Sequence, residues 1–194
     1  YARFDGVAGT YVSTPDSAAN RITGSITMEV DVAPDTWVPT GNDRLVEYNR
    51  IVGSAAYSLI INTAGGLLVQ IRNDAGVLLA NTFSVATGLV AGSRHTVAGT
   101  YNALTGEVEF FVDGSSIGTG VATAGTIATG TGDIVVGGSV KNSTSLEGII
   151  YSAKLYNGVG ASKVLVNNFY PQPYLQGDTN FTSVTGELWT LQGN

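Results

Sequence analysis

The sequence predicts an all-β protein, a two-sheet antiparallel β-sandwich, from three observations. Glycine, threonine, serine, valine and alanine dominate the chain, and charged residues make up only 12% of it, a composition that favours strands and turns over helices. Twelve or more short segments have the pattern of strands, separated by close turns. No segment of useful length has the periodicity of an amphipathic helix. This combination is typical of two packed antiparallel sheets.

Length and composition limit the organisation of the chain and its partners. The 194 residues contain no linker and no block of like charge, so we expect a single domain over 1–194, with 171–194 as a C-terminal extension that closes with an edge strand. The net charge of −6 argues against a nucleic-acid partner. No apolar run is long enough to span a membrane, and the absence of cysteine excludes disulfides. Because the chain opens on Tyr1, we expect a processed or excised piece of a longer protein.

The strands are predicted from alternation and from turn residues. The clearest strand covers 25–32, where Ile26, Met28 and Val30 would face inward, and Pro34 ends it. The other predicted strands cover 1–7, 11–13, 44–50, 57–62, 67–73, 77–83, 133–137, 147–156, 164–166 and 187–191. A loop rich in glycine, threonine and alanine is expected over 118–132.

A hairpin over 95–113 is the centre of the predicted fold. Asn102 and Gly106 supply the positive φ values that its tight loop needs. One face of the hairpin suits a dry core, and the other, which is both acidic and aromatic, suits a surface. The residues predicted near the core are Met28, Val30, either Val97 or Ala98 with the pairing register favouring Ala98, Phe110, Val112, Ile149 and Tyr151.

Six short segments follow one another in a familiar order. They are Phe4-Asp5-Gly6 with Tyr11-Val12, Ile26 to Val32, His95 to Tyr101, Phe111 to Gly114, Val136-Gly137-Gly138, and Leu146 to Tyr151. Together they resemble the concanavalin A-like lectin/glucanase superfamily, and within it the laminin G-like and pentraxin-like jelly rolls. The resemblance runs from about residue 3 to residue 157 and implies a jelly-roll sandwich.

A narrower resemblance covers both ends of the chain. Residues 31–37, 177–182 and 187–191 are similar to jelly-roll domains in structural proteins of tailed bacteriophages. This resemblance implies a virion surface, or another extracellular surface, where such domains contact host glycans or decorate the particle. Other virion proteins would then be partners, with many copies of the chain on each particle.

The catalytic pattern of this superfamily is incomplete in the chain. Its glycosidases carry Glu-x-Asp-x-x-Glu, or a variant one residue longer, on one strand, so that two carboxylates share a face. Glu29-Val30-Asp31 begins the pattern, but Pro34 and Asp35 stand where the second glutamate belongs. The single histidine, His95, has no Gly-x-Ser-x-Gly elbow to serve and is interpreted as a packing or hydrogen-bonding residue. We therefore predict that the chain is not an enzyme.

Calcium is the metal that the resemblance implies, because many relatives hold one with aspartate carboxylates and loop carbonyls. The candidate ligands are Asp5, Asp16, Asp113 and Asp133, each of which also suits a turn or a helix cap. A single histidine and no cysteine argue against zinc and redox metals.

Sugar binding needs an aromatic ring for the apolar face of the sugar and polar groups for its hydroxyls. The candidate residues are Trp37, Tyr48, Arg50, Arg72, Asn73, Tyr101, Glu109 and Phe111. Among them, the face that carries Glu109 and Phe111, or the loop with Trp37, is the predicted site. Because the chain is acidic, neutral glycans are expected to bind better than sialylated or sulfated ones. Trp189 is instead predicted to lie in the core.

These observations lead to two functional hypotheses. The first is a non-catalytic, lectin-like carbohydrate-binding or adhesion module on a virion or another extracellular surface. The alternative is a structural decoration protein of the virion that acts through protein contacts and binds no sugar.

Overall fold

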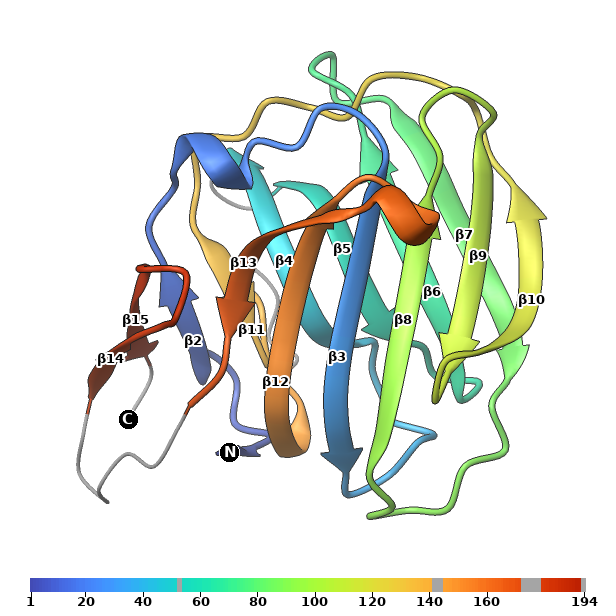
Figure 1. Cartoon of the computed structure of the whole chain (residues 1–194). Coiled ribbons are helices and arrows are strands. Elements are labelled where there is room, and N and C mark those ends of the chain that lie inside the picture. The colour runs from blue at the N-terminus through green and yellow to red at the C-terminus, as the bar shows by residue number, and fades with distance from the viewer. Residues whose placement is uncertain (52–53, 141–144, 172–178, 193–194) are drawn as a thin grey trace.

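The computed structural model describes residues 1–51, 54–140, 145–171 and 179–192. Within these residues two antiparallel sheets pack one behind the other (Figure 1). This arrangement confirms the predicted all-β sandwich. The two helical segments of the described chain are single 3₁₀ turns, η1 (Ala18–Asn20) and η2 (Gly160–Ser162). Neither turn, and no other helix there, has the length and apolar character of a membrane span.

The sheet nearer the viewer in Figure 1 is called the front sheet here. Its strands run in the order β1–β12–β3–β8–β9–β10, and β13 also pairs with β12. Their bounds are β1 (Ala2–Asp5), β12 (Glu147–Asn157), β3 (Ile26–Pro34), β8 (His95–Tyr101), β9 (Glu107–Val112), β10 (Ser115–Val121) and β13 (Val164–Phe169).

The rear sheet has the order β14–β15–β2–β11–β4–β5–β6–β7. Its strands are β14 (Asn180–Thr182), β15 (Leu188–Gln192), β2 (Tyr11–Thr14), β11 (Ile134–Val136), β4 (Asp43–Ile51), β5 (Ser54–Ile61), β6 (Gly66–Arg72) and β7 (Leu78–Ala86). The C-terminal hairpin of β14 and β15 therefore extends this sheet beyond β2. The buried Trp189 packs there against the rings of Phe169 and Phe181, which confirms its predicted place in the core.

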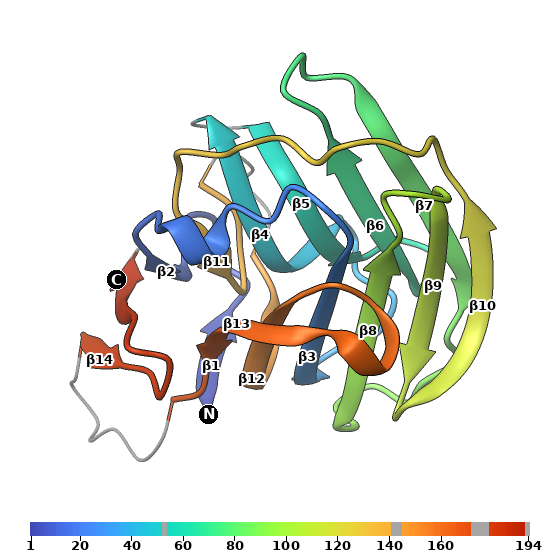
Figure 2. The same ribbon diagram turned by 45° about the horizontal axis from the view of Figure 1, so that its top comes forward.

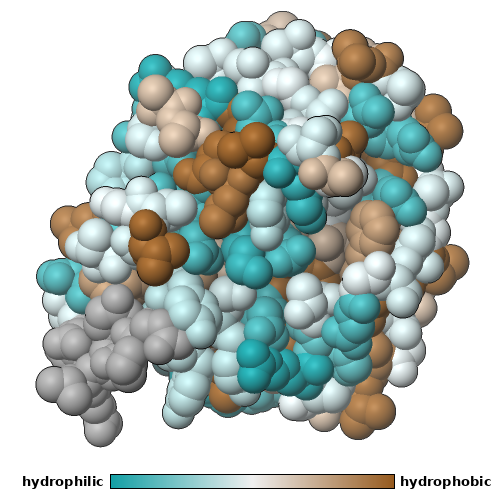
Figure 3. Space-filling model, viewed as in Figure 1, coloured by the Kyte–Doolittle hydropathy of each residue, from teal (hydrophilic) through white to brown (hydrophobic). Residues whose placement is uncertain are grey.

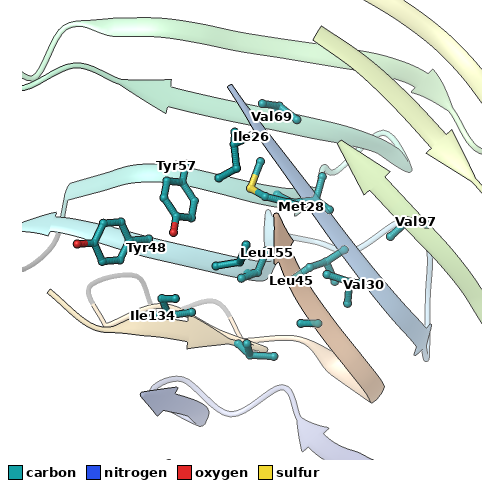
Figure 4. Close-up of a cluster of buried hydrophobic side chains, with 14 of the residues drawn as sticks. Ile26, Met28, Val30, Leu45, Tyr48, Tyr57, Val69, Val97, Ile134 and Leu155 are labelled. Atoms are coloured by element: carbon teal, nitrogen blue, oxygen red, sulfur yellow. The ribbon is translucent and has the colours of Figure 1, made fainter. Parts of the chain in front are cut away.

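The core lies between the inward faces of the two sheets. Figure 4 shows Met28 and Val30 of β3 in one buried cluster with Leu45 and Tyr48 of β4. All four side chains are completely buried. Alternation along β3 therefore predicts its buried face correctly, because one face of each sheet meets the other sheet and the opposite face meets water.

The register of the β8–β9 hairpin differs by one residue from the predicted one. Val97 pairs with Val112, and Tyr101 pairs with Val108. Val97 is therefore in the core and Tyr101 points inward, whereas Ala98 points outward beside Phe111. Of the two alternatives left open, Val97 is the core residue, and the preference for Ala98 was wrong, because the pairing of β8 with β9 depends on the length of the loop that joins them.

The prediction that Ile149 and Tyr151 lie in the core was also wrong. The structure buries Ile150 instead, and leaves Ile149 and Tyr151 half-buried. A β-bulge is the reason: opposite β3, the register shifts between Ile150 and Ser152, which makes Tyr151 an extra residue. A bulge reverses the alternation, so a periodicity read from the end of β12 assigns the wrong face at its beginning.

Candidate functional site

A groove of about 270 Å³ lies on the outward face of the front sheet, above β8. This face is largely hydrophilic, with separate hydrophobic patches, in the space-filling view of Figure 3. The groove is lined by Thr27, Glu29, Thr96, Ala98, Thr100, Phe111, Gly114, Gly160 and Lys163.

The sequence of β8 explains why the surface is hollow there. Its outward side chains, Thr96, Ala98 and Thr100, are short and form the floor. The strands on either side carry longer side chains: Glu29 of β3 and Phe111 of β9 both pair with Ala98. These two residues therefore face each other across two strand spacings, or about 10 Å.

Glu29 is the charged centre of one wall. Its Oε1 accepts a hydrogen bond from Lys154 Nζ at 3.1 Å and another from the Tyr156 hydroxyl at 3.5 Å. Its Oε2 lies 3.9 Å from Nζ of Lys163. Burial acts to lower the pKa of Lys154, but the hydrogen bond and the charge of Glu29 outweigh it and raise that pKa. Lys154 thus remains charged and balances the carboxylate.

The chain around η2 closes one end of the groove. Figures 1 and 2 both show η2 lying over the ends of β3 and β8. Two hydrogen bonds fix this segment: the amide of Gly158 donates to the Ser25 carbonyl at 2.8 Å, and Thr27 Oγ1 donates to the Gly158 carbonyl at 2.9 Å. Lys163 Nζ also lies 4.3 Å from the centre of the Tyr156 ring. These contacts hold the ammonium of Lys163 at the groove.

Three of the predicted sugar-binding aromatic residues are not available for stacking. Trp37 is 2% exposed, and Tyr48 and Tyr101 are 0% exposed. Tyr48 and Tyr101 point into the sandwich because they occupy inward positions of β4 and β8, and the Trp37 ring packs edge-on against His95. These assignments are therefore corrected: among the predicted aromatic residues, Phe111 is the one at the groove.

The predicted polar residues are divided between the two sheets. Glu109 shares the outward face of β9 with Phe111 and is half-buried beside Thr100. Arg72 and Asn73 lie at the end of β6 in the rear sheet, where Asn73 Oδ1 accepts the amide of Val77 across a turn. They do not join the groove. Arg50 belongs to β4 of the rear sheet, and its side chain lies outside the described residues.

The four predicted calcium ligands do not form a cluster. Among the described residues, no group of three acidic, histidine or cysteine side chains is placed to hold a metal. Asp5 caps its own turn by accepting the Val7 amide at 3.0 Å. Asp16 accepts from Tyr48, and nearby Asp133 has its pKa raised by burial and by the charge of Asp16. A calcium ion stays a prediction from the resemblance.

The fourth candidate, Asp113, belongs to a hydrogen-bonded chain that the sequence did not predict. His95 Nδ1 lies 2.7 Å from Asp113 Oδ2, and His95 Nε2 lies 3.1 Å from Ser93 Oγ. This is the order of contacts in a hydrolase triad, but the Ser93 hydroxyl donates to the carbonyl of Val90. Its proton is thus engaged by the main chain, and the interpretation of His95 as a hydrogen-bonding residue is confirmed.

The carboxylates of the incomplete glycosidase pattern each hold a separate cation. Glu29 contacts Lys154, Asp31 accepts two hydrogen bonds from Arg94, and Asp35 accepts two from Arg3. Each carboxylate of the pattern is thus engaged by a basic side chain of the chain itself.

Lys163, Lys154 and Tyr156, like Glu29 and the floor residues, are part of the site but were not among the predicted sugar-binding residues. The alternation of Thr96, Ala98 and Thr100 was a usable signal for a shallow floor. The contacts of Lys163 join strands far apart in the chain, which no local pattern reveals.

Several solved structures have the same fold. A Bacteroides ovatus protein assigned to carbohydrate binding superposes on 98% of the chain with a TM-score of 0.68 and 15% identity. The chain spans only 59% of that protein's length. The CBM40 module of the Ruminococcus gnavus IT-sialidase, solved with α2,3-sialyllactose, covers 82% of the chain and matches over 94% of its own length, with a TM-score of 0.59 and 18% identity. The leech intramolecular trans-sialidase covers 80% of the chain, which spans 27% of that enzyme, with a TM-score of 0.58 and 18% identity.

Sequence comparison identifies the family directly. No curated protein sequence matches the chain. A family profile, however, matches residues 5–161, most of the chain, and its description is the Concanavalin A-like lectin/glucanases superfamily. The six segments in the sequence and the two packed antiparallel sheets agree with this match. The chain belongs to the concanavalin A-like lectin/glucanase superfamily.

Proposed function

We propose that the chain is a non-catalytic, lectin-like module that binds neutral glycans in the groove above β8, on a virion or another extracellular surface. One observation carries this proposal: the half-buried Phe111 ring stands opposite Glu29 and Lys163 over a floor of short side chains. An aromatic ring suits the apolar face of a sugar, and the opposite wall offers both a donor and an acceptor to hydroxyls.

The net charge of the chain supports a neutral ligand. Glu29 and Lys154 balance each other, and Lys163 adds one positive charge to the same wall, so these three groups alone do not exclude an anion. The net charge of −6, however, would repel anionic glycans at longer range. Sialyllactose, which is present in the structure of the CBM40 module, is therefore the most informative anionic comparison.

A shallow site of this kind gives a dissociation constant on the order of 0.1–1 mM, or about −4 to −5.5 kcal/mol. Useful adhesion would then depend on many copies on one particle, where effective concentration multiplies a weak contact.

We expect no hydrolysis of polysaccharides. Release of reducing sugar that disappears in Glu29→Gln would contradict the non-catalytic assignment.

The test is an NMR titration of the ¹⁵N-labelled chain with neutral oligosaccharides and with α2,3-sialyllactose. Neutral sugars should shift the amides of Thr96, Ala98 and Thr100, and Phe111→Ala should weaken binding about tenfold, because stacking of a ring contributes about 1 kcal/mol or more. Phe83→Ala is the control, because Phe83 is a surface phenylalanine, 54% exposed, that lies on β7 of the rear sheet, away from the groove. Binding of sialyllactose alone would refute the preference for neutral glycans.

The alternative function is structural decoration through protein contacts. The edge strand β7 favours it, because Phe83 and Val85 are exposed there, with 54% and 70% of their surface accessible. Apolar side chains on a strand edge suit association with another chain. If no glycan shifts any resonance of the groove, this alternative takes first place.

A further inference from the structure

The spacing between Glu29 and Lys163 carries information about the ligand. Nζ of Lys163 lies 3.9 Å from Oε2 of Glu29, which is beyond the range of a direct hydrogen bond. The other oxygen, Oε1, already accepts from Lys154 and Tyr156. Both side chains remain reachable from solvent, Lys163 with 30% and Glu29 with 23% of its surface exposed. An acceptor and a donor therefore face the groove with a gap between them.

We infer that this gap selects a sugar hydroxyl that bridges the two groups, donating to Glu29 Oε2 and accepting from Lys163 Nζ. Consider a hydroxyl oxygen that lies about 2.9 Å from Nζ and about 2.7 Å from Oε2. Because Nζ and Oε2 are 3.9 Å apart, the angle between the two contacts at that oxygen is about 90°. That angle lies within about 20° of the tetrahedral geometry of a hydroxyl oxygen, so only a small movement of either side chain is needed.

The bridge discriminates between substituents because it needs a donor and an acceptor on one atom. A deoxy sugar offers neither, and an O-methyl group can only accept. An ammonium would satisfy Glu29 but be repelled by Lys163, and a carboxylate would satisfy Lys163 but be repelled by Glu29. The inference rests on the proposed function and narrows its ligand class to neutral glycans that present an unsubstituted hydroxyl at this position.

The surrounding contacts keep the gap at this width. Lys163 is held over the Tyr156 ring, and Tyr156 donates to Glu29 Oε1. Thr27 anchors the preceding segment through the Gly158 carbonyl. Tyr156 therefore acts as a positioning residue that touches both halves of the bridge.

The experiment uses methyl glycosides of glucose, galactose and mannose, titrated against the ¹⁵N-labelled full chain. The glycoside that shifts the amides of Thr96, Ala98 and Thr100 most strongly is then compared with its monodeoxy, O-methyl, amino-deoxy and uronate derivatives. At one ring position, replacing the hydroxyl in any of these ways should weaken binding about tenfold or more. The reason is that Glu29, Lys163 or both then lose the hydroxyl that bonds to them.

Lys163→Met and Lys154→Met are the matched pair of variants. Both remove one positive charge beside Glu29, but only Lys163 faces the gap at Oε2. Lys163→Met should weaken binding of the parent glycoside about tenfold and abolish the preference for a hydroxyl over the amino-deoxy derivative, because the ammonium is then no longer repelled. Lys154→Met should retain that preference. Heteronuclear spectra of both variants establish that they are folded.

The outcomes separate this inference from the proposed function. If Phe111→Ala abolishes binding while Lys163→Met leaves affinity and preference unchanged, the groove binds glycans but the bridge is refuted. If both lysine variants lose the preference equally, the effect is one of charge, and the bridge is again refuted. If none of the three methyl glycosides shifts the groove amides, the bridge and the proposed glycan site both fail.

Discussion

At the scale of single residues, Phe110 and Phe111 show how one strand serves both the core and the candidate groove. They are neighbours on β9, yet alternation sends Phe110 into the core with 0% exposure and Phe111 into the groove. One ring therefore contributes to stability through complete burial, and the other is available to a ligand. Their identical chemistry makes them a natural pair for separating folding from binding.

Replacing Phe110 with alanine should lower the free energy of unfolding by roughly 3–5 kcal/mol, because it removes a fully buried ring and leaves a cavity. Phe111→Ala should lower it by less, since that ring is half-buried at a groove open to water. Urea unfolding followed by circular dichroism measures both changes. Equal losses in the two variants would mean that the assignment of faces on β9 is incorrect.

At the scale of elements, one glycine, Gly106, determines the backbone conformation of the loop between β8 and β9. Gly106 has φ of 74° and donates its amide to the Asn102 carbonyl at 2.8 Å. Its own carbonyl accepts the amide of Ala122, so the chain after β10 passes directly against it. A side chain at this position would overlap the carbonyl oxygen of Ala122.

Gly106→Ala should therefore destabilise the protein more than Gly9→Ala does. Gly9 also has a positive φ, of 88°, but no atom lies within 4 Å of where its Cβ would be. Gly9→Ala should cost about 1 kcal/mol for the left-handed backbone alone, and Gly106→Ala should cost a further 1–3 kcal/mol, approximately, for overpacking. Thermal or urea unfolding of the pair provides the comparison, and equal losses would show that the loop tolerates the extra atom.

At the scale of the whole molecule, Asp43 couples the two sheets electrostatically. Asp43 begins β4 of the rear sheet, and Glu147 begins β12 of the front sheet. Burial, and then the negative charge of Glu147, raise the pKa of Asp43 to about 6 from 3.8. The folded protein thus holds this proton more tightly than the unfolded chain does. Its contribution to stability is fully present below pH 3.8 and is lost as the pH rises through about 6.

Asp43→Asn should consequently be more stable than the unchanged protein at pH 7, because asparagine cannot ionise. The difference in the free energy of unfolding between the two proteins should shrink as the pH is lowered from 7 to about 4. Urea unfolding at a series of pH values measures this dependence. A difference that stays constant over the range would refute the raised pKa of Asp43.

Much of the fold could be predicted from the sequence because strand alternation and turn residues are local properties. The inward face of β3 and the buried Trp189 follow from such patterns. The assignments at β8 and β12 failed because each depends on an event between strands. These events are the loop that sets the register of Val97 and the bulge at Tyr151. Alternation divides the side chains of a strand between two faces. Only the pairing with neighbouring strands decides which of the two faces is buried.

For the candidate site, the sequence by itself determined that Phe111 and Glu109 lie on a surface opposite the core. Only the tertiary structure decided that Phe111 faces Glu29 across β8. It also decided that Lys163, which is 134 residues (163 − 29) further along the chain than Glu29, lies beside it. It also removed Trp37 from the surface by burying it against His95. The physical reason is that the order of strands in the sheet determines which side chains line a groove. Neighbouring strands of the front sheet are distant in the chain, so a local sequence pattern contains no information about the contacts between them.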